Sequence, residues 1–178
     1  MKKFLAMAAV LAAAGATSAA SLNWNISAIY QPGTTTLASG YKAYLFITEQ
    51  SGDFGATVTT ADSVVEAMKS GADLTDYIAA TGTTSDKGMV SGATGYYGAF
   101  GAGDSLTAFA VIVDAADYKS ASNYIVTTEK SQSWTSSTGA KALAFGSQAN
   151  ATWVSVPEPA TAALALLGLG LMIKRRKA

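Results

Sequence analysis

The stretch SLTAFAVIVD (Ser105–Asp114) gives the strongest strand prediction in the chain, because apolar and β-branched residues fill most of it. The stretch YKAYLFIT (Tyr41–Thr48) is aromatic and apolar on both faces, so we expect that strand to lie centrally in a sheet. Earlier in the chain, apolar and polar residues alternate from Asn23 to Tyr30, and Gln31-Pro32-Gly33 then ends the strand. These three segments predict a core built on β-sheet.

Shorter strands are expected in the second half of the chain, at Asn123–Glu129, Lys141–Phe145 and Ala151–Val156. A weak strand is also expected around Tyr96–Phe100, inside a Gly/Thr/Ser-rich stretch that otherwise predicts loop. No internal repeat is evident. We therefore predict a mainly β fold, an antiparallel β-sandwich or squat barrel of about six or seven strands with a short helical insertion.

The helical insertion is predicted at residues 59–74 (TTADSVVEAMKSGADL). Thr60 or Asp62 can cap its start, Ser63 and Glu66 have capping-box spacing, and Gly71 ends the helix. Its apolar face is formed by Val64, Val65 and Met68. A second short helix is predicted at residues 74–80.

Charge is unevenly distributed along the chain. Six of the twelve basic residues lie in the two end segments, so the middle carries six lysines, no arginine and eleven acids, a net charge of −5. Such a surface cannot neutralise phosphates, which argues against nucleic-acid binding. Cysteine and histidine are absent, which excludes disulfides, haem attachment, Cys/His zinc sites and Ser-His-Asp triads. The sequence therefore predicts no cofactor and no metal.

The N-terminal residues 1–20 have the three parts of a secretory signal peptide. Lys2 and Lys3 come first, an apolar stretch follows, and Ser18 and Ala20 are the small residues that signal peptidase requires. We therefore expect signal peptidase to release a secreted β-rich domain, residues 21–155, that begins near Ser21.

Residues 156–178 combine a Pro-Glu-Pro tripeptide, an apolar run and a basic end. The apolar run, Ala160–Ile173, has 14 residues and reaches about 21 Å as a helix, which is short of a hydrocarbon core of about 30 Å. A Pro-x-Pro element is stiff and extended, so a processing enzyme can grip it. We predict that this apolar run forms a transmembrane helix. By the positive-inside rule, the basic residues that follow it place its C-terminus in the cytoplasm: Lys174, Arg175, Arg176 and Lys177.

In the order and spacing of these three parts, the C-terminal segment resembles the PEP-CTERM sorting signal of Gram-negative bacteria that make exopolysaccharide. The resemblance implies that an exosortase, an integral membrane cysteine transpeptidase, recognises Pro157, Glu158 and Pro159. It also implies that the helix is held only transiently in the inner membrane and is then discarded. A run too short for comfortable residence in the bilayer is sufficient for that purpose.

The middle of the chain is similar to a loosely defined group of small secreted proteins that bear this signal. The shared features are an Asn-Trp strand (Asn23-Trp24), the sequence AYLF (Ala43–Phe46) and an ending that contains Phe145-Gly146, Trp153 and the VPEP sequence. This resemblance implies no activity.

Four aromatic residues in Gly-rich or Ser/Thr-rich stretches are candidate glycan contacts, because exposed flat rings can stack on sugars. They are Tyr96, Tyr97, Phe100 and Trp134. Packing is the alternative interpretation for these rings. Trp24, Trp153, Tyr44 and Phe46 lie in strand patterns instead, where large aromatic side chains stabilise a core.

Paired aspartates are the only candidates for catalysis. A glycosidase needs two carboxyl groups about 5 to 9.5 Å apart across a cleft, which spacing in the sequence does not establish, and aspartate is also favoured in turns and caps. The pairs are Asp114 with Asp117, Asp73 with Asp76, and Asp86 with Asp104. We therefore expect no enzyme activity, and a calcium site at Asp114 and Asp117 is a further alternative.

Together, these features predict an exported structural or interaction protein. We expect it to pass through the inner membrane, to be processed by an exosortase, and to reach the cell surface or the exopolysaccharide matrix. Two alternatives stay open: a carbohydrate-binding module or adhesin, and a membrane-anchored external domain that keeps its tail.

Overall fold

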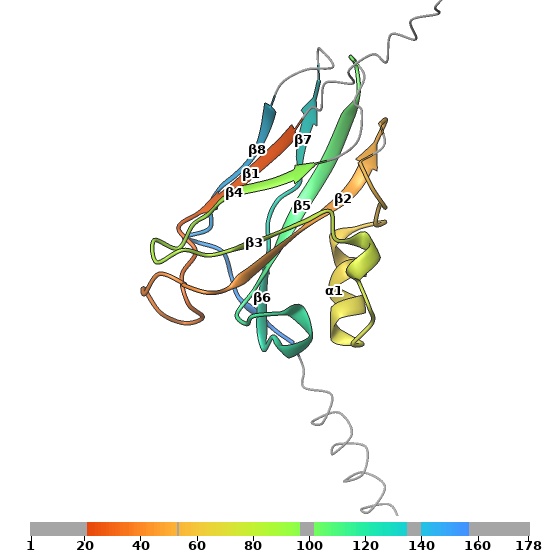
Figure 1. Ribbon diagram of the computed structural model, residues 1–178. Coiled ribbons are helices and arrows are strands. Elements are labelled where there is room, and N and C mark those ends of the chain that lie inside the picture. Colours follow the sequence, from red (N-terminus) through yellow and green to blue (C-terminus); the bar gives the residue numbers. More distant parts are fainter. Residues whose placement is uncertain (1–20, 53, 97–101, 135–139, 157–178) are drawn as a thin grey trace, which may run out of the picture.

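The computed structural model describes residues 21–52, 54–96, 102–134 and 140–156 (Figure 1). These residues form nine strands, one α-helix and two 3₁₀ turns. In chain order the elements are β1 (Ser21–Ser27), β2 (Lys42–Gln50), α1 (Ala61–Lys69), η1 (Thr75–Tyr77), β3 (Ala80–Thr83), β4 (Val90–Tyr96), β5 (Ser105–Val113), η2 (Tyr118–Ser120), β6 (Asn123–Val126), β7 (Lys130–Ser133), β8 (Ala140–Ser147) and β9 (Val154–Ser155).

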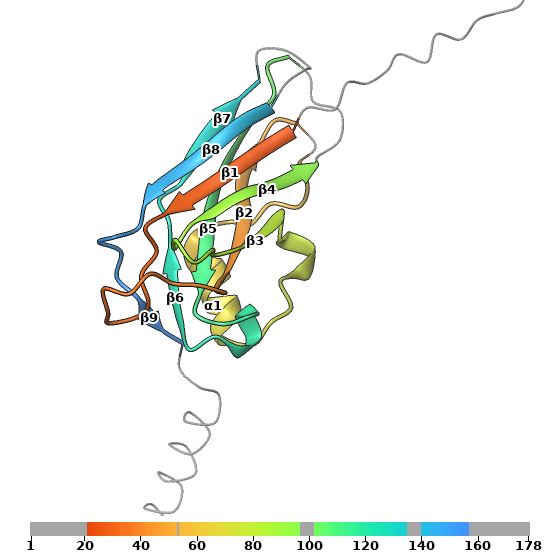
Figure 2. The ribbon, with the colours of Figure 1, turned by 60° about the vertical axis from the view of Figure 1, so that its left-hand side comes forward.

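The strands form two sheets that pack face to face (Figure 2). The smaller sheet has the order β4-β1-β8, and β1 runs antiparallel to β4 but parallel to β8. The larger sheet has the order β3-β2-β5-β6-β9, and β7 pairs with the first half of β5. All pairs of the larger sheet are antiparallel.

The structure confirms a mainly β fold with two sheets and one helix. A squat barrel is wrong for the described residues, because the two sheets have separate hydrogen-bonded ladders and do not close. The antiparallel expectation fails at one pair, since β8 runs alongside β1 in the same direction. Two additional strands are short: β3 lies where a helix and a loop were predicted, and β7 follows the expected end of the strand at 123–129. The strand β4 lies in the stretch predicted as loop and ends at Tyr96, where the weak strand was expected to begin, and residues 97–100 of that prediction lie outside the described residues.

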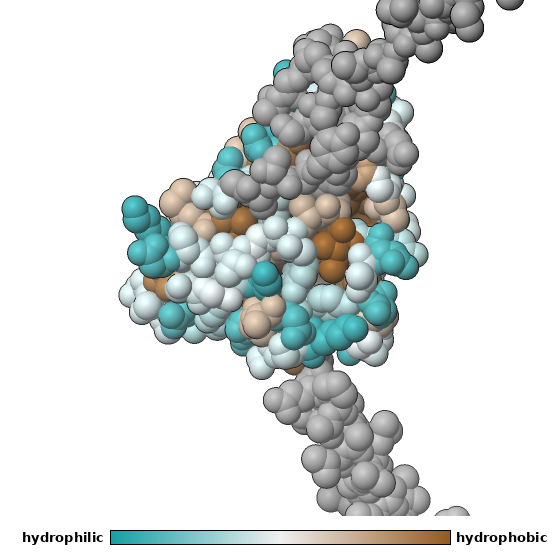
Figure 3. Space-filling model, viewed as in Figure 1, coloured by the Kyte–Doolittle hydropathy of each residue, from teal (hydrophilic) through white to brown (hydrophobic). Residues whose placement is uncertain are grey.

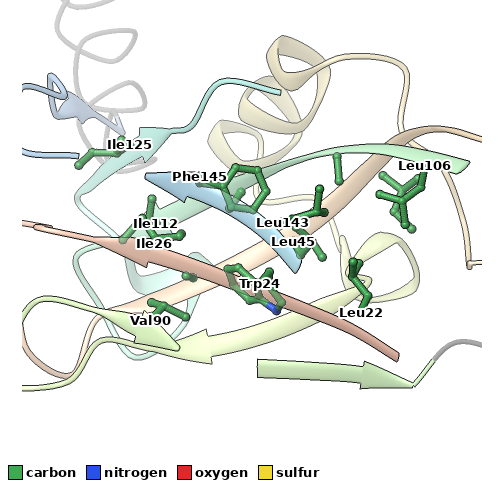
Figure 4. Packing of buried hydrophobic residues seen from close by; sticks show 14 of the residues in the cluster. Leu22, Trp24, Ile26, Leu45, Val90, Leu106, Ile112, Ile125, Leu143 and Phe145 are labelled. Carbon is green, nitrogen blue, oxygen red and sulfur yellow. The ribbon is translucent and has the colours of Figure 1, made fainter. Parts of the chain in front are cut away.

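Residues of both sheets form a core between them (Figure 4). Along β1, Leu22, Trp24 and Ile26 are all buried and face the larger sheet, as the alternation in the sequence predicts. The strand ends earlier than expected, because Ala28 adopts a left-handed backbone with φ of 50°. In this core, the three buried side chains of β1 are joined by residues from other strands, among them Leu45, Leu106, Ile112, Leu143 and Phe145.

The larger sheet is buried on its other face as well. Phe46 of β2 and Phe109 of β5 stack there at a centroid distance of 5.6 Å, and helix α1 packs against this face through Val64, Val65 and Met68. The prediction that the strand at 41–48 lies centrally is therefore confirmed, because β2 is paired on both edges and covered on both faces.

Helix α1 begins and ends through local side-chain and backbone chemistry. Thr60 is the N-cap and forms a reciprocal capping box with Ser63, so the box lies one turn earlier than the predicted pair of Ser63 and Glu66. At the other end, Gly71 has φ of 72° and its N–H donates to the Met68 carbonyl, while the Ala72 N–H donates to Ala67. This is a Schellman ending, which requires the positive φ that glycine supplies.

The predicted second helix at 74–80 is only the 3₁₀ turn η1, and β3 begins at Ala80, the last residue of the predicted helix. The predicted strand at 151–156 is confined to β9. The predicted signal peptide and sorting helix lie outside the described residues. Among the residues that are described, no helix is long and apolar enough to cross a membrane.

Candidate functional site

The predicted site residues fall into two groups. Pro157, Glu158 and Pro159 lie outside the described residues, as do the basic residues 174–177, Tyr97 and Phe100. Tyr96 is the last residue of β4. Trp134 is among the described residues, and its position corrects the prediction of a glycan contact.

Trp134 is buried, with 1% of its surface exposed. Its ring packs against Phe54 at a centroid distance of 4.9 Å, and both rings belong to the core between the sheets. A sugar cannot stack on a ring that is enclosed by protein. The Ser/Thr-rich sequence around Trp134 suggested an exposed turn. Trp134 instead directly follows the edge strand β7, and its side chain points into the core.

The junction between the domain and the sorting segment lies at β9, which forms one edge of the larger sheet. Ser155 pairs with Asn123 and Val154 pairs with Tyr124. One residue further on, the Val156 N–H donates to the carbonyl of Ser122 at 2.8 Å. The folded domain therefore extends to the residue that immediately precedes the Pro-Glu-Pro tripeptide.

A single carboxylate organises the strand against which β9 lies. One Asp114 oxygen accepts hydrogen bonds from the N–H groups of Ser122 and Asn123, at 2.9 and 2.8 Å. The other oxygen accepts from the Asn123 side-chain amide at 2.7 Å. The amide oxygen of Asn123 in turn accepts from the Ser155 hydroxyl at 3.2 Å. Asp114 thus fixes the start of β6 and, through Asn123, the position of Ser155.

Trp153 anchors the chain just before β9. Its indole N–H donates to the backbone carbonyl of Tyr30 at 2.9 Å, and its ring meets Tyr41 edge to face at 5.8 Å. The side chain is half-buried and packs against the core between the sheets, in agreement with the prediction for this residue. Its hydrogen bond joins two segments that are 123 residues apart.

Two other aspartates of the predicted pairs bind nearby groups of the same chain. Asp117 caps η2 by accepting from the N–H groups of Lys119 and Ser120, and these hydrogen bonds lower the pKa of its carboxyl. Asp73 accepts from the side chain and backbone of Thr75 and from the Tyr118 hydroxyl, which lowers its pKa to about 2. These are turn and cap interactions. In the described part of the chain, no group of three or more acidic, Cys or His residues is arranged to hold a metal ion.

A surface groove with a volume of about 600 Å³ lies at the end of β2 and the start of β5. Its walls are mainly hydroxyl and amide side chains with one carboxylate: Thr48, Glu49, Gln50, Ser51, Thr57, Ser105, Leu106 and Thr107. A smaller, more apolar depression of about 260 Å³ shares Thr57 with it and includes the exposed Tyr77. On the face shown in Figure 3, hydrophobic areas are small and separated by polar ones.

The chain enters and leaves the domain at opposite ends. β1 begins near the end of the sandwich at which β4 finishes and β8 starts, whereas β9 lies at the other end, beside the start of β6 (Figure 2).

Comparison with known families identifies the C-terminal segment. Residues 155–177 match the family described as PEP-CTERM protein-sorting motif. No curated protein and no solved structure matches the chain significantly. The match begins at Ser155, inside β9, and so overlaps the folded domain. The chain carries a PEP-CTERM protein-sorting motif in its C-terminal region, which marks it as an exported protein that is processed by an exosortase.

Proposed function

We propose that the protein works outside the cell as a structural or interaction component of the cell surface or the exopolysaccharide matrix, after an exosortase has removed its C-terminal tail. The sorting motif at residues 155–177 is the observation that carries this proposal. Because the motif begins inside β9 and continues directly from the β domain, processing beyond Val156 would deliver the domain as a single unit.

Several features support a role that depends on presence rather than on catalysis. Asp73, Asp114 and Asp117 are engaged in turns, caps and the β6 junction. The middle of the chain contains neither histidine nor cysteine and carries a net charge of −5. An acidic surface keeps a protein soluble and disfavours non-specific adsorption to other polyanions.

Carbohydrate binding is a second candidate, and the polar groove beside β2 and β5 favours it. Its hydroxyl groups are suited to a neutral sugar, and Tyr77 supplies an exposed ring in the adjoining depression. Binding of the exopolysaccharide from the producing cells should weaken at least several-fold in Thr57→Ala combined with Tyr77→Ala, because the exposed Thr57 lines both depressions. If both chains bind equally in isothermal titration, the groove is not the site.

Mass spectrometry of the C-terminal peptide from native cells tests the leading proposal. We expect chains that end at or before Pro159, with an added mass where a lipid or glycan has been joined. A chain that still ends in Lys174-Arg-Arg-Lys177-Ala178 would instead support a permanent anchor. Deletion of Pro157–Pro159 is the matched control, because a sorted protein should then accumulate uncut in the inner membrane whereas an anchored one should be unaffected.

A further inference from the structure

The sorting motif and the folded domain share residues. The motif begins at Ser155, yet Ser155 is paired with Asn123 in the larger sheet and the Val156 N–H is bonded to Ser122. The Val156 side chain is also partly buried against the helix-side cluster of the sheet. The first part of the motif is therefore occupied by the domain before any enzyme binds it.

We call residues 153–156 the C-terminal strap. It is held by the Trp153 indole bond to Tyr30, by the two-residue pairing of β9 with β6, and by the Val156 N–H bond. Val154 is 43% exposed, and Ser155 is exposed as well. A two-residue edge strand with exposed side chains is among the segments that open locally at low free energy.

Covalent geometry brings the domain close to any enzyme that binds the tripeptide. Three extended residues span at most about 11 Å, so Pro159 cannot lie further than that from Val156. Enzymes that bind extended peptides pair with their backbone groups. In the strap, backbone groups of the residues just before Pro157 are already bonded to β6.

We propose that the strap covers the N-terminal part of the sorting motif, and that it must detach from β6 before the exosortase can bind, so that the fold of the domain controls processing. This inference rests on the proposed function, because it concerns the same cleavage. Trp153 and Asp114 are positioning residues here: Trp153 holds the strap directly, and Asp114 holds the Ser122–Asn123 segment to which the strap is bonded.

A spacer separates strap release from motif recognition. Inserting Gly-Ser-Gly-Ser-Ser-Val between Val156 and Pro157 leaves the strap in place and gives the tripeptide a second Ser-Val that is free of β6. The same six residues inserted between Gly55 and Ala56, in an exposed loop beyond the end of β2 that is remote from the strap, serve as the control. Pulse-chase labelling with C-terminal mass spectrometry in exosortase-bearing cells measures the rate of cutting.

We expect the spacer at Val156 to speed cutting several-fold, and the control insertion to leave it unchanged. Trp153→Phe keeps an aromatic ring but removes the indole N–H, and should speed cutting about fivefold in the chain without a spacer, as expected for one lost hydrogen bond. Asp114→Asn should act in the same direction. Neither substitution should matter once the spacer is present. Equal rates for all chains would overturn the inference.

A reversible lock provides the opposite test. Asn123 and Ser155 are directly opposite one another in the antiparallel pair, and the bond between Val156 and Ser122 makes theirs a non-hydrogen-bonded position, where Cα atoms lie about 4.5 Å apart. That spacing suits a disulfide, and the chain has no other cysteine. The double variant Asn123→Cys, Ser155→Cys should be cut slowly when oxidised and faster after reduction, with the wild-type chain under the same reductant as the control.

The outcomes distinguish the two proposals. If the wild-type chain is cut but the spacer, the substitutions and the lock have no effect, the strap inference fails and the proposed function stands. If the wild-type chain is never cut, the proposed function fails and the inference fails with it.

Discussion

The first and last strands of the domain, β1 and β9, differ in how firmly the fold holds them. β1 lies between β4 and β8, and its three inward side chains, Leu22, Trp24 and Ile26, are fully buried. β9 has one partner, lies at a sheet edge and exposes both of its side chains. The comparison indicates that the N-terminal end of the domain separates only when the domain unfolds, whereas the C-terminal end can detach by itself.

The largest effect should come from removing the central ring of β1. Trp24 packs edge to face with Phe145 at 6.4 Å and is 1% exposed. Trp24→Ala should therefore lower the free energy of unfolding by about 3 to 5 kcal/mol, measured by denaturant titration of the full chain in detergent. A loss below about 1 kcal/mol would show that β1 is not the firmly held end.

A smaller effect is expected from the corresponding tryptophan at the other end. Trp153→Phe removes the hydrogen bond to the Tyr30 carbonyl and should cost about 1 kcal/mol. Hydrogen exchange should increase at residues 154–156 while β1 stays protected. If exchange rises equally in both strands, the two ends are coupled and the comparison fails.

Sequence and structure agree best where burial determines the pattern. The alternation in β1 and the two-sided apolar runs of β2 and β5 were predictable, because each residue there faces one layer of the fold. The helix was predictable because Thr60, the Val64-Val65 pair and Gly71 are local signals. The parallel pairing of β1 with β8 depends on contacts between distant segments, which no local pattern encodes.

The candidate site divides in the same way. The sorting motif was recognisable because its parts are contiguous in the sequence, and the family match confirms it. The strap was not recognisable, because its contacts join segments that are far apart in the sequence. Trp153 meets Tyr30, and Val156 meets Ser122, which Asp114 holds, only after folding. An Asp at the end of a strand and an Asn at the start of the next was the available signal, and by itself it indicates only a turn. The burial of Trp134 likewise depends on the tertiary position of Phe54.

A substitution just after β1 tests the same comparison through a small expected gain in stability. Ala28 has φ of 50°, a left-handed conformation that glycine adopts without strain. Ala28→Gly should raise the free energy of unfolding by about 0.5 to 1 kcal/mol, measured as above, without changing exchange in β9. A loss of stability would mean that the Ala28 methyl contributes more by packing than its backbone costs.

The smallest expected effect lies away from both ends, at Asp73. Its pKa is lowered to about 2, first by the Thr75 hydrogen bonds and then by the Tyr118 hydroxyl and Lys119. A lowered folded-state pKa stabilises the fold above the unfolded value near 4, and this contribution is lost as the pH falls from about 4 to 2. In thermal unfolding, the melting temperature of Asp73→Asn should therefore approach that of the wild-type chain as the pH falls over that range. A difference in melting temperature that widens toward pH 2 would contradict the assignment.

Hydrogen exchange at single-residue resolution on the full wild-type chain measures the difference between the two ends most directly. The account predicts that the Val156 amide, bonded to the Ser122 carbonyl, exchanges through local opening at a free energy well below that of global unfolding, while the Trp24 and Ile26 amides exchange only with the whole domain. Protection of Val156 equal to that of Trp24 would contradict it, because the strap could then detach only when the domain unfolds.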